Sequence, residues 1–463
     1  MVSRRGSTNG RLAEAWTTLA FRRHAVGSML AWPIAYPAAW AWRRLVLRRT
    51  RVVAVTGSLG KTSTAAAAAA AVGAPFDPNA ANYGSFLAAA VLRCRPRQRW
   101  LVVEVAISRP GQMRAYARLL RPDVVILTGI GGEHLSVFGS LEALAREKAI
   151  LPLAVRRRGL VVVNADDERC LAIGGRAAAR VVRVGFAAGS DWRIEEASLD
   201  WPRGTSLRLA SPAGGLALST RWIGRDLARC AAFATAASLE AGGDVAAVIA
   251  RLADLSPTPW RQEPMALPGG AWLLCDAWKG SWRSMQSALG VLQGIASWRR
   301  VAVLGAIEEP EGGQAVAYRR YGRLAAAAAQ RLLFVGTFAE YRHFRVGVRE
   351  AGPAAPALEH CVDAAAAAAA LRDELQDGTV ILVKGRQRQK LGRVALLLRG
   401  ETVDCRLRLC PARGLRCELC PRLRAVPAAI ERVAAEPPTP AAAGQATPSV
   451  AEPAGTGDER MER

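Results

Sequence analysis

Lysine, asparagine and histidine are scarce in this sequence. Of its 63 basic residues only five are lysine and 58 are arginine, and there are four asparagines and four histidines. Alanine is very abundant, so a GC-rich coding bias accounts for the arginine better than a nucleic-acid groove does. The repeated basic–aromatic platforms that such a groove would use are not evident. The net charge of +24 therefore does not predict dedicated nucleic-acid binding.

This scarcity makes the remaining lysines informative. Arginine is always charged and forked, whereas lysine is a compact cation whose nitrogen can become neutral and react. If arginine replaces lysine wherever it can, the surviving lysines mark positions where arginine would fail. They are Lys61, Lys148, Lys279, Lys384 and Lys390, although Lys390 can also be read as an ordinary surface residue.

Residues 25–42 are uncharged and lie between two pairs of arginines. Eighteen such residues just reach the length of a membrane span, and the segment contains three tryptophans and a tyrosine, which favour an interface. Pro33 and Pro37 weaken a straight helix. Two alternatives stay open: contact with a membrane, or a hairpin packed on the domain that follows. A cleaved signal peptide is disfavoured, because the glycine-rich stretch GSLGKT (57–62), which predicts a site for cytosolic ATP, follows almost directly.

From residue 51 to about 185, continuous apolar strands alternate with amphipathic helices. Such alternation is typical of a parallel, helix-covered sheet. Residues 190–222 look like short antiparallel strands, and a second unit with strands and alanine-rich helices begins near 266. We therefore predict an α/β protein, in which a central parallel-sheet P-loop ATPase domain precedes a smaller Rossmann-like α/β domain.

The expected division of the chain has five parts. They are a basic and apolar N-terminal segment (1–50), a central ATP-binding domain (51–265), a C-terminal α/β domain (266–400), a cysteine cluster (401–424) and a tail (425–463). The tail is rich in proline, alanine and glutamate, and this composition predicts disorder.

The stretch VVAVTGSLGKTST, residues 52–64, joins a β-branched strand to a glycine turn and a helix. Backbone N–H groups of such a turn can face phosphates at the helix N-terminus. Lys61 would reach the β- and γ-phosphates and the Thr62 hydroxyl would bind Mg²⁺. Val55 occupies the first glycine position of the usual phosphate-loop pattern. The loop residues predicted to bind ATP are Gly57, Ser58, Gly60, Lys61, Thr62 and Ser63.

These motifs, in order along residues 50–400, resemble those of the Mur ligase family. TGSLGKTST is similar to its ATP loop, LVVEVAISRPGQM to its strand with a metal-binding glutamate, and PDVVILTGIGGEHLSVFGSLEALAREKAIL to its next strand and helix. TPWRQE, DAWKGSWRSM and TVILVKG resemble its interdomain and C-terminal segments. The branch that the chain resembles joins D-alanyl-D-alanine to a UDP-muramyl tripeptide.

The resemblance implies the roles of several residues. Thr62 and Glu104 would bind a first Mg²⁺, and His134 and Lys148 a second. Lys148 would do so as a carbamate formed with CO₂, which a protonated guanidinium could not form. Alternatively, Lys148 is an ordinary solvated lysine on a helix, and His134 makes a structural hydrogen bond and binds no metal. The resemblance also places Asn82, Arg261 and Asp276 at the nucleotide.

Three departures from the family pattern affect the parts of the protein that would bind the two substrates. Only about 50 residues precede the ATP loop, so we expect the usual N-terminal UDP-sugar domain to be lacking. The family's T-N-I-G is T-G-I-G at residues 128–131, and its Y-N-A-N-P is W-K-G-S-W at residues 278–282. The ATP chemistry is expected to be intact, with a carboxylate donor or an amine acceptor that has diverged.

Four of the nine cysteines lie within 16 residues. In a reducing compartment, clustered thiols that end in C-x-x-C indicate a metal in preference to disulfides. Zn²⁺ is favoured over an iron–sulfur cluster, with free thiols as the alternative, since the spacings are irregular. The predicted ligands are Cys405, Cys410, Cys417 and Cys420.

The sequence thus predicts an ATP-dependent ligase that joins a carboxylate to the amine of an amino acid or dipeptide through an acyl phosphate, with ATP and Mg²⁺. Its carboxylate substrate would be a small or nucleotide-linked molecule, in the family's cell-wall peptidoglycan role. The alternatives are a membrane-associated ligase for another polymer, like the poly-γ-glutamate synthases, and a non-catalytic ATP-binding scaffold. The expected location is cytoplasmic, with association at the inner membrane face left open.

Overall fold

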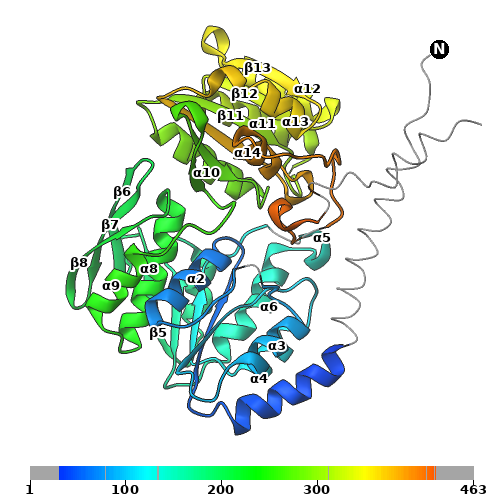
Figure 1. The fold of residues 1–463 in the computed structure, drawn as a ribbon. Coiled ribbons are helices and arrows are strands. Elements are labelled where there is room, and N and C mark those ends of the chain that lie inside the picture. The colour runs from blue at the N-terminus through cyan, green and yellow to red at the C-terminus, as the bar shows by residue number, and fades with distance from the viewer. Residues whose placement is uncertain are drawn as a thin grey trace, which may run out of the picture.

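The computed structural model describes residues 31–78, 80–132, 135–310, 312–412, 414–421 and 423. These residues form two lobes, each built on its own sheet (Figure 1). In the described residues, the first sheet has the strand order β2-β1-β3-β4-β5-β6-β7-β8, and the second β13-β12-β11-β14-β10-β9.

The first lobe contains β1 (Arg51–Thr56), β2 (Trp100–Glu104), β3 (Val124–Leu127), β4 (Leu160–Asn164), β5 (Arg180–Gly185), β6 (Trp192–Asp200), β7 (Gly204–Ser211) and β8 (Gly214–Thr220). Its helices are α2 (Lys61–Val72), α3 (Ser85–Arg93), α4 (Gln112–Leu120), α5 (Leu135–Phe138), α6 (Leu141–Leu153), α7 (Glu168–Gly174), α8 (Arg225–Glu240) and α9 (Val245–Ala253).

The second lobe contains β9 (Glu263–Ala266), β10 (Trp272–Asp276), β11 (Arg299–Gly305), β12 (Arg331–Val335), β13 (Ala357–Cys361) and β14 (Thr379–Lys384). Its helices are α10 (Trp282–Gly294), α11 (Gln314–Ala328), α12 (Phe338–Arg349), α13 (Ala364–Ala369) and α14 (Gly392–Leu398).

Alternate residues of β1 enter two different cores. Val53 and Val55 pack with α2 and α8, whereas Val52 and Ala54 pack with α3, α4 and α6 on the opposite face. Because side chains alternate along a strand, a strand covered by helices on both faces must be apolar throughout. The continuous apolar runs in the sequence predicted this arrangement, and strands β1 to β5 are indeed parallel.

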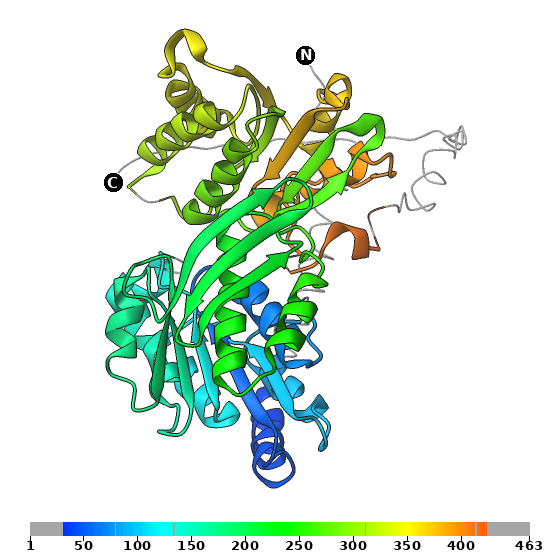
Figure 2. The ribbon, with the colours of Figure 1, turned by 90° about the vertical axis from the view of Figure 1, so that its left-hand side faces the viewer.

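The predicted antiparallel strands of residues 190–222 are β6, β7 and β8. They extend the first sheet beside its parallel strands (Figure 2). Trp201, in the turn after β6, contacts Trp272 at the start of β10 with a centroid distance of 6.2 Å. The hairpin therefore touches the second sheet. Strands β9 and β13 were not predicted, because their exposed and polar residues break the apolar runs.

Residues 31–45 are helical and continue through Pro33 and Pro37, so the expected weakening of the helix by these prolines was wrong. Ala39 is fully buried, and Trp32 packs edge-on against Tyr116 of α4 at 5.8 Å. This packing offsets the backbone donors that proline lacks. In the described part of the chain, no helix is long and apolar enough to cross a bilayer. Residues 1–30 and the predicted disordered tail lie outside the described residues.

Glu374 lies in the short helical turn Arg372–Glu374 and binds two arginines at the starts of β11 and β12. Its carboxylate accepts hydrogen bonds from Arg299 at 2.6 and 2.9 Å and from Arg331 at 3.0 Å. These contacts, those of Arg299 foremost, lower the pKa of Glu374 to about 2. A carboxylate whose pKa is lowered by folding stabilises the fold above its unfolded pKa, and this contribution disappears as the pH falls through the folded pKa.

We therefore expect Glu374→Gln to lower the free energy of unfolding by about 2 kcal/mol at pH 7, allowing for the half-exposed Arg299. The difference should shrink steadily between about pH 4 and pH 2, because wild-type Glu374 becomes protonated there. Urea unfolding of both proteins at pH 7 and pH 3 measures this. An equal loss at the two pH values would show that the charge is not the cause.

Candidate active site

The phosphate loop has the backbone that the glycines predicted. Gly57 has φ +143°, and a Cβ there would lie 2.1 Å from the Thr128 hydroxyl. Gly60 caps α2 with φ 79° and supplies no side-chain hydrogen bond, so the first N–H groups of this 12-residue helix are not capped by a side chain. Such an N-terminus favours phosphate. Lys61 is buried, and its Nζ donates to the Ser58 carbonyl at 3.0 Å.

The turn after β3 braces this loop. Ser58 donates its N–H to the Gly129 carbonyl at 2.8 Å, and its hydroxyl exchanges hydrogen bonds with Gly131 at 2.8 and 3.1 Å. The Thr128 hydroxyl donates to the Leu59 carbonyl at 2.6 Å. The T-G-I-G sequence thus holds the loop mostly through backbone groups, which the change from asparagine to glycine leaves in place.

Oxygen ligands suited to Mg²⁺ meet beside the loop. The Thr62 hydroxyl donates to the Glu104 carboxylate at 2.6 Å, and the Asn82 amide donates to its other oxygen at 2.7 Å. Arg261, from the linker between the two sheets, donates to the Thr62 hydroxyl at 3.0 Å. Mg²⁺ prefers such hard oxygen donors, so Thr62 and Glu104 fit the ion. His134 lies outside the described residues, and its metal role stays a prediction.

Lys148 of α6 is only 3% exposed. Its Nζ donates to the Gly57 carbonyl at 2.6 Å and to the Ser58 hydroxyl at 3.0 Å. The alternative of a solvated helix lysine was therefore wrong, because the side chain points from α6 into the back of the phosphate loop. The carbamate on Lys148 stays a prediction.

The second sheet faces the loop with a buried ion pair. Asp276 and Lys384 end the neighbouring strands β10 and β14, and their side chains are 2.9 Å apart. Lys384 also donates to the Lys279 carbonyl at 2.7 Å. Asp276 was predicted to contact ATP, and in this structure it lines the cavity while paired with Lys384.

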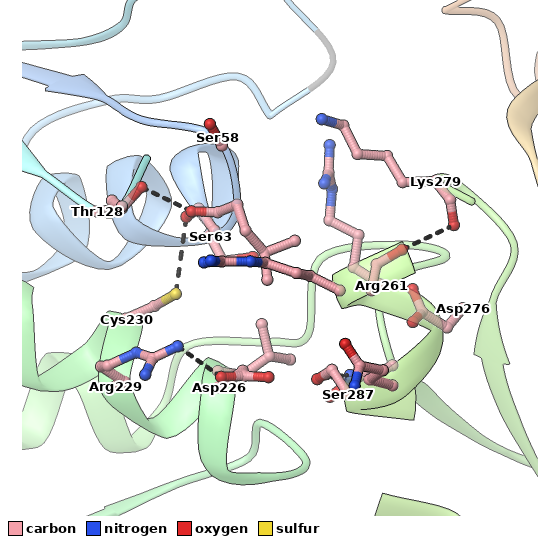
Figure 3. A pocket seen from close by; sticks show the side chains of 18 of the residues that line it. Ser58, Ser63, Thr128, Asp226, Arg229, Cys230, Arg261, Asp276, Lys279 and Ser287 are labelled. Carbon is pink, nitrogen blue, oxygen red and sulfur yellow. Dashed lines mark hydrogen bonds and ion pairs between the residues drawn. The ribbon is translucent and has the colours of Figure 1, made fainter. Parts of the chain in front are cut away.

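A cavity of about 480 Å³ lies between the two lobes. Figure 3 shows its lining: Ser58 and Ser63 from the loop and Arg261 from the linker face Asp276 and Lys279 of the second lobe. Cations are in excess around it, as a polyphosphate requires. The structure thus brings the predicted loop residues, Arg261 and Asp276 together, with Thr62 held against Arg261.

Trp278, which departs from the family pattern, also lines this cavity. Its ring lies 6.5 Å from that of Trp260, with the Arg261 guanidinium at 5.8 Å and the Lys390 ammonium at 5.9 Å. Cations over an aromatic face are stabilising. Lys390 is only 2% exposed, so the reading of an ordinary surface lysine was wrong.

Several lining residues were missed from the sequence. Arg229 pairs with Asp226 at 2.6 Å and with Asp166 at 3.3 Å. Cys230 lies beneath the loop, its sulfur 3.6 Å from the Gly60 carbonyl, and burial raises its pKa to about 11. It is therefore a neutral packing group. Nothing in the sequence separates Arg229 or Arg283 from the 56 other arginines, because local pattern carries no information about a distant partner.

A second cavity of about 570 Å³ shares Ser58, Leu59, Lys279 and Arg283 with the first and extends over the second lobe. Glu308, Glu309, Arg386 and Arg388 all line it, and the N–H of Gln387, between the two arginines, donates to the Glu308 carboxylate at 3.4 Å. The Nε atoms of both these arginines are buried and, in the described structure, have no hydrogen-bond partner. Unpaired buried donors favour an anionic ligand.

The four clustered cysteines lie apart from the ATP cavity. All four line a hollow of about 20 Å³ together with Lys390 and Arg393, and all are free thiols. As the described side chains stand, no group of three or more His, Cys, Asp or Glu is arranged to hold a metal ion. The four cysteines as they stand are thus not arranged as the expected metal site.

Gly57→Ala is expected to abolish measurable nucleotide binding while the protein stays folded. The new Cβ would meet the Thr128 hydroxyl at 2.1 Å and two Gly129 backbone atoms at 3.1 Å, so the loop must leave its position. Gly111→Ala is the matched control, because Gly111 also has positive φ but open space around it. Titration of ADP by calorimetry tests both variants. Normal ADP affinity in Gly57→Ala would contradict the loop assignment.

Comparison with known proteins gives the family. The Mur ligase middle domain matches residues 55–238. The UDP-N-acetylmuramoyl-tripeptide–D-alanyl-D-alanine ligase of Mycobacterium tuberculosis is 32% identical over 375 residues, which cover 76% of this chain and 73% of that protein. The Escherichia coli ligase of the same name is 29% identical over 309 residues, covering 65% and 67% of the two chains.

Solved structures agree in fold. A MurF ligase from Thermotoga maritima in complex with ADP superposes with a TM-score of 0.69 at 19% identity, covering 80% of this chain and 83% of that one. MurF from Acinetobacter baumannii also gives 0.69, at 20% identity, covering 79% and 80%. The predicted fold class is confirmed. This chain belongs to the Mur ligase family and is an ATP-dependent ligase of the Mur type.

Proposed function

We propose that this ligase joins a carboxylate to the amine of an amino acid or dipeptide through an acyl phosphate, in the peptidoglycan role of its D-alanyl-D-alanine-adding relatives. The observation that carries the proposal is the pair of connected cavities. One is lined by the phosphate loop and the linker arginine, and the other by acidic and basic side chains of the second lobe.

The carboxylate must first be activated, because amide formation in water is uphill. A carboxylate oxygen attacks the γ-phosphorus and ADP leaves. Lys61, Arg261 and the loop N–H groups bind the phosphates and hold them in place for this transfer. Mg²⁺ bound by Thr62 and Glu104, and by His134 and Lys148 if the family set is complete, would neutralise charge on the phosphates.

The amine then attacks the acyl carbon and phosphate leaves. Residues of the second cavity suit an amino acid or dipeptide, which has one charge at each end. Arg386 and Arg388 can bind the carboxylate, and Glu308 and Glu309 can bind the ammonium before it loses its proton. The four cysteines line neither cavity, so a metal there would be structural and would take no part in the reaction.

The test is ADP release by the purified protein with bicarbonate present. UDP-muramyl tripeptide and D-alanyl-D-alanine are added separately and together, with Lys61→Ala as the blank. We expect release only with both substrates and a condensed product of the matching mass. Release with other carboxylate–amine pairs alone would keep the ligase chemistry and overturn the peptidoglycan substrates. If no pair of substrates stimulates ADP release, the proposal is wrong.

We also propose that the N-terminal helical residues 31–45 contact an anionic membrane surface. Ile34, Trp40 and Leu45 on this helix are 77%, 42% and 65% exposed. A hollow of about 380 Å³ beside them is lined by five arginines, namely Arg44, Arg114, Arg118, Arg121 and Arg156. Exposed apolar side chains next to clustered cations are typical of surface binding to acidic lipids.

Co-sedimentation with vesicles tests this contact. The full chain should bind vesicles that contain phosphatidylserine and not vesicles of phosphatidylcholine alone. Arg114→Glu with Arg118→Glu should reduce binding, since each arginine near the surface contributes about 1 kcal/mol. Equal binding to both lipids, or to neither, would overturn the proposal.

A further inference from the structure

The two cavities of the candidate active site meet, and four residues line both of them, namely Ser58, Leu59, Lys279 and Arg283. In the acyl-phosphate route proposed above, the reaction crosses this junction. The phosphoryl group leaves the nucleotide in the first cavity, and it lies on the acyl carbon when the amine of the second cavity attacks. A side chain that stabilises this group in both steps must therefore reach both cavities.

Arg283 is the second residue of α10, and its side chain extends from the second lobe to the first. Its Cδ and Nε atoms lie 3.7 Å from where a Cβ on Gly131 would be, in the turn that braces the phosphate loop. The residue is exposed, and no described residue makes a hydrogen bond or ion pair with its guanidinium. Its five N–H donors are thus available to a ligand at the junction.

The other three shared residues are less suited to a phosphoryl group. The N–H and the hydroxyl of Ser58 are used by Gly129 and Gly131, and the Leu59 side chain is apolar. Lys279 carries a point charge. A guanidinium instead presents parallel N–H groups to two oxygens of one phosphoryl group, so Arg283 fits this ligand best.

The start of α10 is anchored in the second lobe. The Glu308 N–H donates to the Gly280 carbonyl at 2.7 Å, and Met285, in the first turn of the helix, is fully buried in the core. The Cα of Arg283 is therefore held in place, while its long side chain can follow the phosphoryl group. Groups that are held in place before the reaction stabilise developing charge most effectively.

We propose that Arg283 is a catalytic residue that binds the transferred phosphoryl group, first on ATP and then in the acyl phosphate. The proposal rests on the proposed function, because it follows the acyl-phosphate route. In the first step a carboxylate oxygen bonds to the γ-phosphorus, and the bond to the bridging oxygen breaks with its electron pair leaving on ADP. In the second step the amine nitrogen bonds to the acyl carbon, phosphate leaves with the C–O electron pair, and the ammonium protons go to solvent. Arg283 stays protonated throughout and supplies charge and hydrogen bonds.

This role differs from those of the cations already described at the phosphate loop. Lys61 follows the loop, and Arg261 contacts Thr62 and lines the first cavity but not the second. Both are therefore expected to bind phosphates that ADP shares with ATP. Arg283 also lines the second cavity, so its ligand is the γ-phosphoryl group, which ADP lacks.

The first test compares two nucleotides by calorimetry in the presence of Mg²⁺. They are ADP and AMP-PNP, a non-hydrolysable analogue that keeps the γ-phosphoryl group. Arg283→Ala should bind AMP-PNP about tenfold more weakly than wild type, the value of one charge-assisted hydrogen bond, and ADP within about twofold of wild type. Arg283→Lys should recover part of the loss, because it keeps the charge without the fork.

The matched control is Arg342→Ala, at an exposed arginine of α12 that lines neither cavity, and it should change neither affinity. Retained ADP binding also shows that Arg283→Ala is folded. Equal weakening of both nucleotides in Arg283→Ala would overturn the proposal, as would an unchanged affinity for AMP-PNP. This comparison needs neither substrate, so its failure is distinguishable from failure of the proposed function.

The second test measures kcat and KM with both substrates of the proposed reaction. Arg283→Ala should lower kcat by on the order of a thousandfold, as arginines that stabilise phosphoryl transfer do, and should leave the KM of the amine nearly unchanged. A loss confined to the KM of the amine would make Arg283 a substrate-binding residue and overturn the catalytic role. An unchanged kcat would overturn it as well.

Discussion

Lys148→Arg is expected to lower ADP release under saturating substrates by about a hundredfold or more, the usual loss when one transition-state electrostatic group is removed. Lys148 is buried behind the phosphate loop, and its Nζ contacts Gly57 and Ser58. Arginine keeps the positive charge but cannot form a carbamate, and its guanidinium is larger than the space that the ammonium fills.

The carbamate itself gives a separate signal. The Lys148 ammonium must first lose a proton. Its neutral Nζ then adds to the carbon of CO₂ and loses a second proton, which gives an anion that would suit the second Mg²⁺. We expect wild-type activity to fall in CO₂-depleted buffer and to recover with bicarbonate. Labelled bicarbonate should give a ¹³C carbamate resonance that is absent in Lys148→Arg.

The matched control is Arg146→Lys, which places a lysine on the exposed side of α6 two residues away. It should change neither the rate nor the ¹³C spectrum. A wild-type enzyme that does not respond to bicarbonate and shows no carbamate resonance would leave Lys148 as an ammonium that braces the loop. The carbamate proposal would then be wrong, even if Lys148→Arg is inactive.

Lys384→Met is expected to give the largest loss of stability, about 3–5 kcal/mol in the free energy of unfolding. Lys384 is fully buried and pairs with Asp276 at 2.9 Å between neighbouring strands of the second sheet. Methionine nearly fills the space of the lysine stem but leaves the Asp276 carboxylate buried without its cation.

Urea unfolding of the single and double variants separates charge from packing. Lys384→Met combined with Asp276→Leu removes both charges, and we expect it to recover at least half of the loss. A double variant as unstable as the single one would mean that packing, or the bond to the Lys279 carbonyl, is the cause.

The local patterns of residues in the sequence predicted much of the fold and of the candidate active site. The apolar runs predicted the parallel strands, because a strand covered on both faces must be apolar along its whole length. The phosphate loop was predicted because Gly57 and Gly60 adopt backbone conformations that few other residues reach. With lysine so rare, Lys61, Lys148 and Lys384 could be singled out, and all three are buried. The metal role of His134 stays a prediction.

Other features depended on which strands become neighbours. Asp276 and Lys384 are 108 residues apart and meet only because β10 pairs with β14, an order that no local pattern contains. The sequence alone allowed Lys390 to be read as a surface residue, whereas in the structure it is buried beside the four cysteines of residues 405–420. The roles of Arg386 and Arg388 rest on burial of their Nε atoms.

The sequence by itself therefore determined the fold class and the phosphate loop, because these follow from backbone geometry and the period of apolar residues. Only the tertiary structure decided what lies beside each buried charge: Asp276 beside Lys384, and the four thiols beside Lys390 and Arg393. The reason is that the cost of burying a charge is set by its neighbours in space, and sheet order brings those neighbours from distant parts of the chain.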